Sequence, residues 1–268
     1  MSRVWWAVWR RERQVWSGFR LSLLINLAGL ALSVLPFFYI GSLFGARLPA
    51  ALQAEGLKGG YFAYVLVGLA FSHFLRSGLA AMAVQLQTEQ NQGTLETLVA
   101  SPTPLPVILS ATAAALFVAD CGFALTYLLV GAWLGAPMQA GLAGAAALGL
   151  TALAAGILFS GWGMAAAGIL LVVRRGNPLL WLGAMAFEVF GGVYCPIALL
   201  GEPWATVGRW LPFSHVIALA RASLGLGPWG IWDVISVGVW AVVSLVGGLL
   251  VLRLGVERAR DMGRLQTR

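Results

Sequence analysis

The sequence contains few charged residues. Asp, Glu, Lys and Arg make up only 10% of its 268 residues, whereas 60% are hydrophobic and 34 are glycine. Soluble domains usually carry about 25% charged residues, so this composition excludes a water-soluble enzyme and is typical of an integral membrane protein. One transmembrane helix needs about 20 apolar residues, so we expect about six crossings in a single membrane domain.

The sequence also lacks the motifs that bind nucleotides or catalyse hydrolysis. It contains no Gly-x-x-x-x-Gly-Lys-Ser/Thr phosphate loop, no His-Glu-x-x-His and no Gly-x-Ser-x-Gly. Its two cysteines, Cys121 and Cys195, lie in apolar segments without metal-ligand spacing. We therefore expect no catalytic residue, no metal site and no cofactor bound by this chain, so that any chemical energy must enter through a partner.

Long apolar runs predict an all-α fold with six transmembrane helices. Five runs are long enough to cross a bilayer as single helices, and they span residues 21–44, 61–84, 107–134, 142–173 and 231–252. The remaining crossing, near 179–200, has 15 residues from Leu179 to Val193, or about 22 Å of helix against a core of about 30 Å. Short apolar pieces then continue to Leu226, which predicts broken, re-entrant helices between spans five and six.

The positions of Arg and Lys predict the orientation. Residues 1–20, the loop at 174–175 and the tail after residue 252 hold five, two and five of the 17 basic residues. The positive-inside rule then places both termini in the cytoplasm of a multi-pass cell (inner) membrane protein, and the net charge of +7 indicates topology, not a nucleic-acid partner.

Residues 1–20 combine Trp and Val at helical spacings with Arg on other faces. This pattern predicts an amphipathic helix along the cytoplasmic interface, in contact with membrane lipids. It serves either as a lipid anchor alone or also as a collar that touches a cytosolic partner.

The loop after the second span, Glu89 to Pro102, contains no Lys or Arg. Thr94 is suited to cap a short helix with Glu96 in its first turn, and Ser101-Pro102 would end it. About six residues of helix have no independent stability in water, so Leu95 and Leu98 must dock on another surface. By itself, the loop is better interpreted as a short capped connector.

Two sets of residues resemble one family. The first set is Gly93-Thr94-Leu95-Glu96 followed by Ala100-Ser101-Pro102, and the second is 192–196 (Gly-Val-Tyr-Cys-Pro) followed by 210–213 (Trp-Leu-Pro-Phe) and Arg221. Their order and spacing resemble the ATP-binding-cassette exporter permeases of the second export class, which export polysaccharides, lipid-linked glycans and drugs. The resemblance covers nearly the whole chain.

The resemblance implies a half-transporter. Two copies of the chain would form the pathway, and two copies of a separate cytosolic ATPase, which binds ATP and Mg, would dock below. Residues 93–100 would form the coupling helix, and the turn with Arg174 and Arg175 would be a second contact, although topology favours reading that turn as a positive-inside anchor. The implied ATPase-coupling interface is Glu89, Gly93, Thr94, Leu95, Glu96, Leu98, Arg174 and Arg175. The implied outer gate contains Tyr194, Pro196, Pro212 and Arg221.

Three ionisable residues, Arg76, Asp120 and Glu188, lie within predicted spans. Charges at that depth are costly and normally face a bundle interior or a cavity. These residues are possible pathway residues, or they pair with each other or hold helices together. A second hypothesis follows from the two acids: an ion-coupled secondary transporter would use Asp120 and Glu188 to relay protons. The identity of the substrate does not follow from the sequence.

Overall fold

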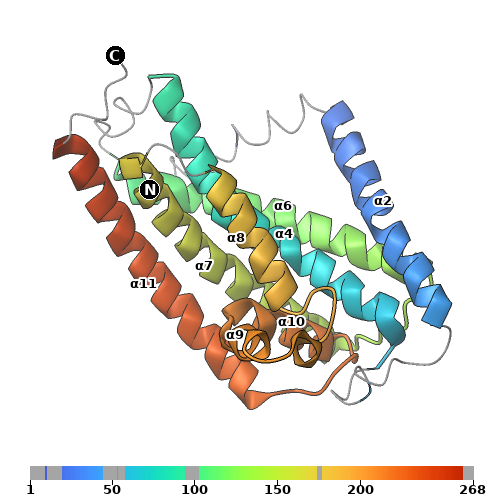
Figure 1. Ribbon diagram of the computed structural model, residues 1–268. Coiled ribbons are helices and arrows are strands. Elements are labelled where there is room, and N and C mark those ends of the chain that lie inside the picture. The colour runs from blue at the N-terminus through green and yellow to red at the C-terminus, as the bar shows by residue number, and fades with distance from the viewer. Residues whose placement is uncertain are drawn as a thin grey trace.

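The computed structural model describes residues 20–44, 58–93, 103–173 and 177–261, together with the single positions Arg10 and Gln53. The regular elements in these ranges are helices, which confirms the predicted all-α fold class (Figure 1). In chain order they are α2 (Arg20–Phe44), α4 (Gly60–Asn91), α6 (Leu105–Trp133), α7 (Leu142–Val173), α8 (Asn177–Phe190), the 3-10 helix η1 (Ile197–Leu200), α9 (Trp204–Trp210), α10 (Pro212–Ser223) and α11 (Ile231–Asp261).

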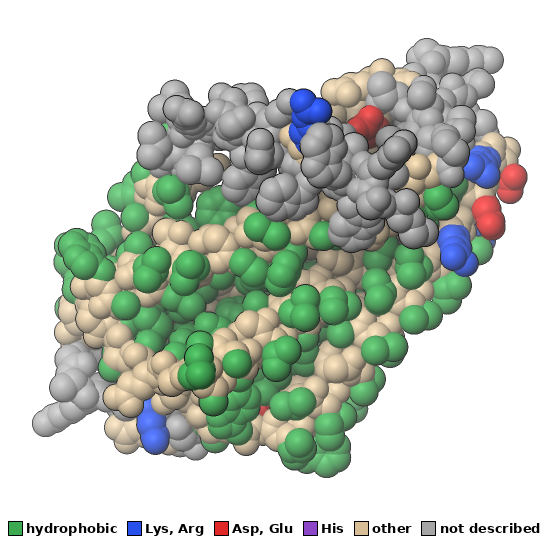
Figure 2. Space-filling view, turned by 180° about the vertical axis from the view of Figure 1, so that it is seen from behind, with side chains coloured by type: hydrophobic (Ala, Val, Ile, Leu, Met, Phe, Trp, Pro, Cys, Tyr) green, Lys and Arg blue, Asp and Glu red, His purple; other side chains and the backbone are tan. Residues whose placement is uncertain are grey.

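Five of these helices, α2, α4, α6, α7 and α11, are long and apolar enough to cross a membrane. Hydrophobic side chains cover most of the flank seen in Figure 2, and its charged side chains lie mainly toward one end. Exposed large residues such as Leu43, Leu129 and Val242 would be unfavourable in water but match a lipid environment. The chain is therefore a multi-pass membrane protein.

Helix α4 lies at the centre of the bundle, where it packs against α7, α6, α2 and α8 (Figure 1). Its apolar window is 71% buried, compared with 11% for α2 and 22% for α7 and α11. The largest fully buried side chains of α4 include Phe71, Phe74 and Leu66. Most side chains in this window of α4 therefore face another helix, which makes α4 the helix most able to hold an internal site.

Helices α7 and α11 pack through glycine. A Cβ atom at Gly248 would lie 2.0 Å from the carbonyl oxygen of Gly161, and one at Gly255 would lie 2.3 Å from that of Gly168. These distances are shorter than van der Waals contact, so only glycine allows the two backbones to approach so closely. Small residues on α7 and α11 therefore permit tight packing of the two helices.

Helix α8 is too short to be the crossing predicted at 179–200. It ends at Phe190, and Gly191 and Gly192 follow in a turn. Gly192 has φ 78°, its N–H donates to Val189 O at 3.4 Å, and the N–H of Val193 donates to Glu188 O at 3.1 Å. This is a Schellman cap, in which a left-handed glycine ends a helix. The sequence predicts 15 helical residues from Leu179 to Val193 in this crossing, and the glycine cap ends α8 three residues earlier, at Phe190.

The chain after α8 continues in short pieces, as predicted. Helices η1, α9 and α10 lie together near the end of the molecule where α11 begins (Figure 1). Pro196 and Leu211 precede η1 and α10, and Pro212 occupies the first turn of α10. A second Schellman cap at Gly225 ends α10, where the N–H of Leu226 donates to Arg221 O at 2.9 Å.

Two long helices extend past the apolar runs that predicted them. Helix α4 continues to Asn91 instead of ending near residue 84, and α11 continues to Asp261 instead of residue 252. The added turns are polar, and polar residues end an apolar run without ending a helix. In the extension of α11, Gly255 and Ala259 remain buried, so this segment still packs against the bundle.

Candidate functional site

An ion pair joins the central helix α4 to α8. The Nε and Nη2 atoms of Arg76 donate to the two carboxylate oxygens of Glu188, the second at 2.7 Å. Glu188 is 1% exposed, and the hydroxyl of Tyr194 donates to its Oε2 at 2.8 Å. The carboxylate thus has a two-pronged cationic partner and a further donor, the arrangement that a buried charge requires.

The local structure of α8 explains why these three groups meet. Glu188 lies in the last turn of α8, and its own carbonyl accepts the Schellman hydrogen bond from Val193. The reversal at Gly192 directs the following chain back along the helix end, so Tyr194 reaches the side chain of Glu188 from beyond the turn. The glycine cap therefore both ends the helix and completes the ion-pair cluster, which we define as Arg76, Glu188 and Tyr194.

A second cluster fixes the short helices to α4. Arg221 in α10 is 6% exposed, and its Nη2 donates to Gly192 O at 2.9 Å and to Tyr64 O at 3.0 Å. The Cζ atom of Arg221 lies 3.4 Å from the centroid of the Tyr64 ring. The Tyr64 hydroxyl donates to the same carbonyl of Gly192 at 2.8 Å. Arg221 therefore satisfies one backbone carbonyl at the α8 cap and one in α4, as buried polar groups require, and its place in an outer gate stays a prediction.

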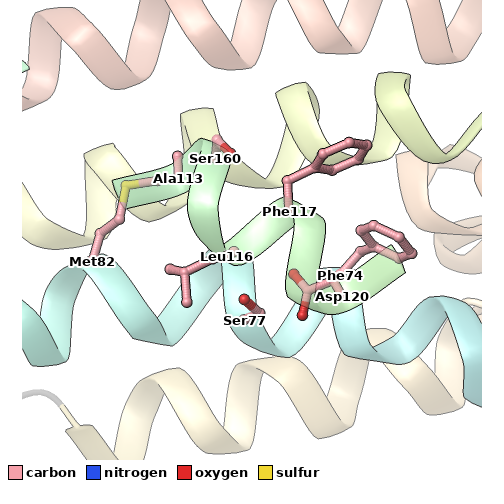
Figure 3. A pocket seen from close by; sticks show the side chains of 10 residues that line it. Phe74, Ser77, Met82, Ala113, Leu116, Phe117, Asp120 and Ser160 are labelled. Atoms are coloured by element: carbon pink, nitrogen blue, oxygen red, sulfur yellow. The ribbon is translucent and has the colours of Figure 1, made fainter. Parts of the chain in front are cut away.

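Asp120 lies apart from both clusters. It is 7% exposed on α6, and Ser77 from α4 lies beside its carboxylate in the same pocket. It lines a small pocket together with Phe74, Phe117 and Ser160 (Figure 3). No ion pair in the described part of the chain includes Asp120, whereas Glu188 has Arg76. Of the three predicted intramembrane charges, two meet and the third does not.

The segment after α8 also contains a short exposed network on α9. Glu202 accepts from the hydroxyl of Thr206 at 2.6 Å, and Nη2 of Arg209 lies 3.4 Å from Glu202 Oε1. The hydrogen bond from Thr206 lowers the pKa of Glu202. The side chain of Glu202 is 59% exposed, so this network contributes little to stability.

The predicted coupling residues are only partly described. Glu89 lies in the last turns of α4, and Gly93 follows the helix in a turn with φ 72°. Thr94, Leu95, Glu96, Leu98, Arg174 and Arg175 lie outside the described residues, as does nearly all of segment 1–20. The coupling helix and the interfacial helix therefore stay predictions.

Sequence reasoning did not identify three members of these clusters. Tyr64, Ser77 and the carbonyl of Gly192 become important only through contacts between helices distant in the sequence. The pair Gly191-Gly192 was the available signal, since glycine near the end of an apolar run is a common helix cap. No comparable signal exists for Ser77, because a single hydroxyl in an apolar helix is common.

The described residues contain no group of three or more His, Cys, Asp or Glu side chains placed to hold a metal ion. The arrangement instead consists of intramembrane charges held by specific partners between helices, with a set of short helices at one end. Such features define a class of protein, a multi-pass transport protein whose interior contains a few fixed polar groups.

Comparison with known protein families agrees with this class. The sequence model of the family described as ABC-2 type transporter matches residues 3–224. This match covers most of the chain, so the chain belongs to the ABC-2 type transporter family and is a permease of that type. No curated protein matches the chain in sequence. The resemblance recognised in the two sequence motifs is confirmed.

Proposed function

We propose that this chain is the membrane-spanning subunit of an ATP-driven exporter, in which two copies form the pathway and two copies of a cytosolic ATPase drive it. The single observation that carries the proposal is the family match over residues 3–224. The permeases of this family normally work with an ATPase subunit. The absence of a phosphate-binding loop from the sequence supports the assignment of ATP and Mg to that partner.

The cargo we propose is amphipathic, drug-like or attached to a lipid or polysaccharide. The inner surfaces of the bundle are mostly apolar, and the two fixed polar clusters are occupied by their own partners. A pathway with few free charges favours a cargo with a large apolar part over a small ion. The cargo is then moved along the bundle by changes in helix packing.

The rival hypothesis is an ion-coupled transporter that relays protons between Asp120 and Glu188. The geometry supports it poorly, because Glu188 is held in a two-pronged ion pair and Asp120 contacts Ser77 instead. A relay needs acids that are free to exchange partners in the cycle, and both carboxylate oxygens of Glu188 already accept from Arg76, with Tyr194 as a further donor. Only the unpaired Asp120 favours this rival.

The proposed orientation places both termini in the cytoplasm and α9 on the outer side. Cysteines at Glu202 and Gly227, in a chain with Cys121 and Cys195 replaced by Ser, should both react with an impermeant maleimide added to intact cells. A cysteine at Glu257 in α11 is the matched control, and it should react only after the membrane is opened. Reaction of Gly227 exclusively from the cytoplasm would add a crossing and contradict the six-span topology.

The decisive experiment tests communication between the permease and an ATPase. The chain alone should hydrolyse no ATP, whereas its complex with a co-purifying Walker-motif ATPase should do so and transport cargo.

Glu96→Lys should assemble yet uncouple hydrolysis from transport, because it reverses the charge of the proposed coupling helix. Glu257→Lys is the matched control, an exposed acid on the same proposed side. Transport by Glu96→Lys at the parent rate would contradict the coupling assignment, and pH-driven transport without ATP would establish the rival.

A further inference from the structure

The carboxylate of Asp120 lacks a cationic partner. It lies midway along α6 and is 7% exposed, and Ser77 of α4 lies beside it in the same pocket. Within the described part of the chain, Glu188, Glu202 and Asp233 each have a cationic or histidine partner, and Asp120 does not. An ionised carboxylate inside a membrane span is costly unless a positive charge accompanies it. The site therefore takes up a proton or a cation.

The pocket beside Asp120 shows which cations fit. Figure 3 shows Ser77 and Asp120 facing each other, with Phe74 next to Asp120 and with Ser160 and Met82 toward the other end. The rings of Phe74 and Phe117 have centroids 5.8 Å apart. The lining therefore combines one carboxylate and one nearby hydroxyl with aromatic rings, and aromatic faces attract organic cations.

A bare metal ion fits this lining poorly. Hard cations in proteins prefer about six or more oxygen ligands. The side chains that line the pocket supply only the Asp120 carboxylate and the hydroxyls of Ser77 and Ser160, and Ser160 lies at the opposite end in Figure 3. A primary ammonium group needs fewer oxygen partners, because its three N–H donors can be shared between the carboxylate and the Ser77 hydroxyl.

The small size of the pocket favours a primary ammonium group over a larger, substituted ammonium group. The space beside Asp120 accommodates about one water-sized group. An –NH₃⁺ head is of that size, whereas a trimethylammonium head is much larger. The other lining side chains include the apolar Leu116, Ala113 and Met82, and the hydrocarbon chain that carries the head group has to lie outside this small space.

We propose that Asp120 and Ser77 form a binding site for the primary ammonium group of a cationic amphiphile. The position of Asp120 halfway along α6 favours a transported amphiphile over a resident aminophospholipid, whose head group lies at the membrane surface about 15 Å away. The identification of this amphiphile as cargo rests on the proposed exporter function, whereas the binding site itself does not.

Carbodiimide labelling tests the site on the whole chain without an ATPase. Dicyclohexylcarbodiimide modifies protonated carboxyl groups in apolar surroundings, and mass spectrometry locates the modified residue. In phosphatidylcholine nanodiscs, Asp120 should be labelled, and dodecylammonium at ten times its Kd should reduce this labelling about tenfold. Dodecanol and dodecyltrimethylammonium are matched controls for chain and charge, and neither should protect Asp120. Equal protection by all three compounds would overturn the proposal.

A second measurement does not depend on labelling. Native mass spectrometry should detect dodecylammonium bound to the parent chain and to Glu188→Gln, but not to Asp120→Asn. Ser77→Ala should weaken binding about fivefold, as expected for one lost hydrogen bond. Equal binding by the parent and Asp120→Asn would overturn the site, whether or not Asp120 reacts with carbodiimide.

The lipid composition of the nanodisc tests whether the bound ammonium group belongs to a cargo molecule or to a membrane lipid. If the ligand is cargo, replacing phosphatidylcholine by phosphatidylethanolamine should leave Asp120 labelling unchanged in the absence of added amine. Protection by phosphatidylethanolamine alone would overturn the assignment to cargo and identify a lipid site. None of these measurements requires an ATPase. A negative result here would therefore contradict the ammonium site alone, whereas the absence of a co-purifying ATPase would contradict the exporter proposal alone.

Discussion

Two buried carboxylates in this permease have opposite surroundings. Glu188 at the end of α8 is held by Arg76 and Tyr194, whereas Asp120 in the middle of α6 has only the hydroxyl of Ser77. Both acids are at least nine-tenths buried. Their difference shows that burial of an acid in a span does not by itself indicate a transport site, because one of the two is already neutralised by the protein.

The central helix α4 supplies both sets of partners. Arg76 and Ser77 are adjacent in the sequence, and adjacent residues of an α-helix point about 100° apart. Arg76 therefore meets α8 while Ser77 meets α6. Helix α4 thus completes a fixed ion pair with Glu188 on one side and leaves Asp120 without a counter-ion on the other. The first acid has a structural role, and the second is the one we propose for binding.

The largest expected effect comes from removing the cation of the ion pair. Arg76→Leu leaves the Glu188 carboxylate buried without its charge partner, a change that costs about 3–5 kcal/mol in buried pairs. Because the side chain of Arg76 is 57% exposed, we expect the lower end, about 3 kcal/mol. Equilibrium unfolding in mixed detergent and dodecyl sulfate measures this loss.

The matched control removes both charges. Arg76→Gln combined with Glu188→Gln keeps hydrogen-bonding groups of similar size and should recover most of the stability lost in Arg76→Leu. If Arg76→Leu unfolds at the parent detergent fraction, the ion pair is not needed to hold α8 against α4, and the contrast with Asp120 disappears.

A smaller effect is expected at the edge of the same cluster. Tyr194→Phe removes the hydroxyl that donates to Glu188 at 2.8 Å but keeps the ring, which stacks on Phe37 with centroids 5.8 Å apart. Hydrogen bonds to charged groups contribute about 1.5–3 kcal/mol, so we expect a loss near the lower figure. Tyr39→Phe, at an exposed ring, is the control and should unfold like the parent. A Tyr194→Phe variant as stable as its control would show that Arg76 alone satisfies Glu188.

The smallest effect on stability is expected at Asp120. Asp120→Asn removes a carboxylate without a counter-ion and retains a group that can bond to Ser77, so its free energy of unfolding should lie within about 0.5 kcal/mol of the parent or above it. The same unfolding assay applies. A loss as large as that of Arg76→Leu would mean that the carboxylate holds helices together, and the contrast between the two acids would fail.

The long helices were predictable because the bilayer imposes a simple requirement. A span needs about 20 apolar residues, so the run at 142–173 coincides with α7, and the run at 21–44 differs from α2 by one residue. The end of α8 was harder to predict, because apolar residues continue past Phe190 while the glycine cap stops the helix. Helix ends depend on backbone hydrogen bonds, which hydropathy does not measure.

The candidate sites were predictable only as single residues. Charges inside a span are costly, so Arg76, Asp120 and Glu188 stand out in the sequence, as does Arg221 through its motif. Their partners could not be assigned from the sequence, since Arg76 and Glu188 are 112 positions apart. Whether Arg76 pairs with Glu188 or with Asp120 depends on how α4 is rotated in the bundle.

The sequence by itself determined that the chain is a membrane protein, where its long helices lie, and which family it belongs to, because these properties depend on local composition and motif spacing. Only the tertiary structure decided that Glu188 is paired and Asp120 is not. The physical reason is that a counter-ion acts over a few ångströms in space, and the distances between side chains are set by how helices pack, not by their order in the chain.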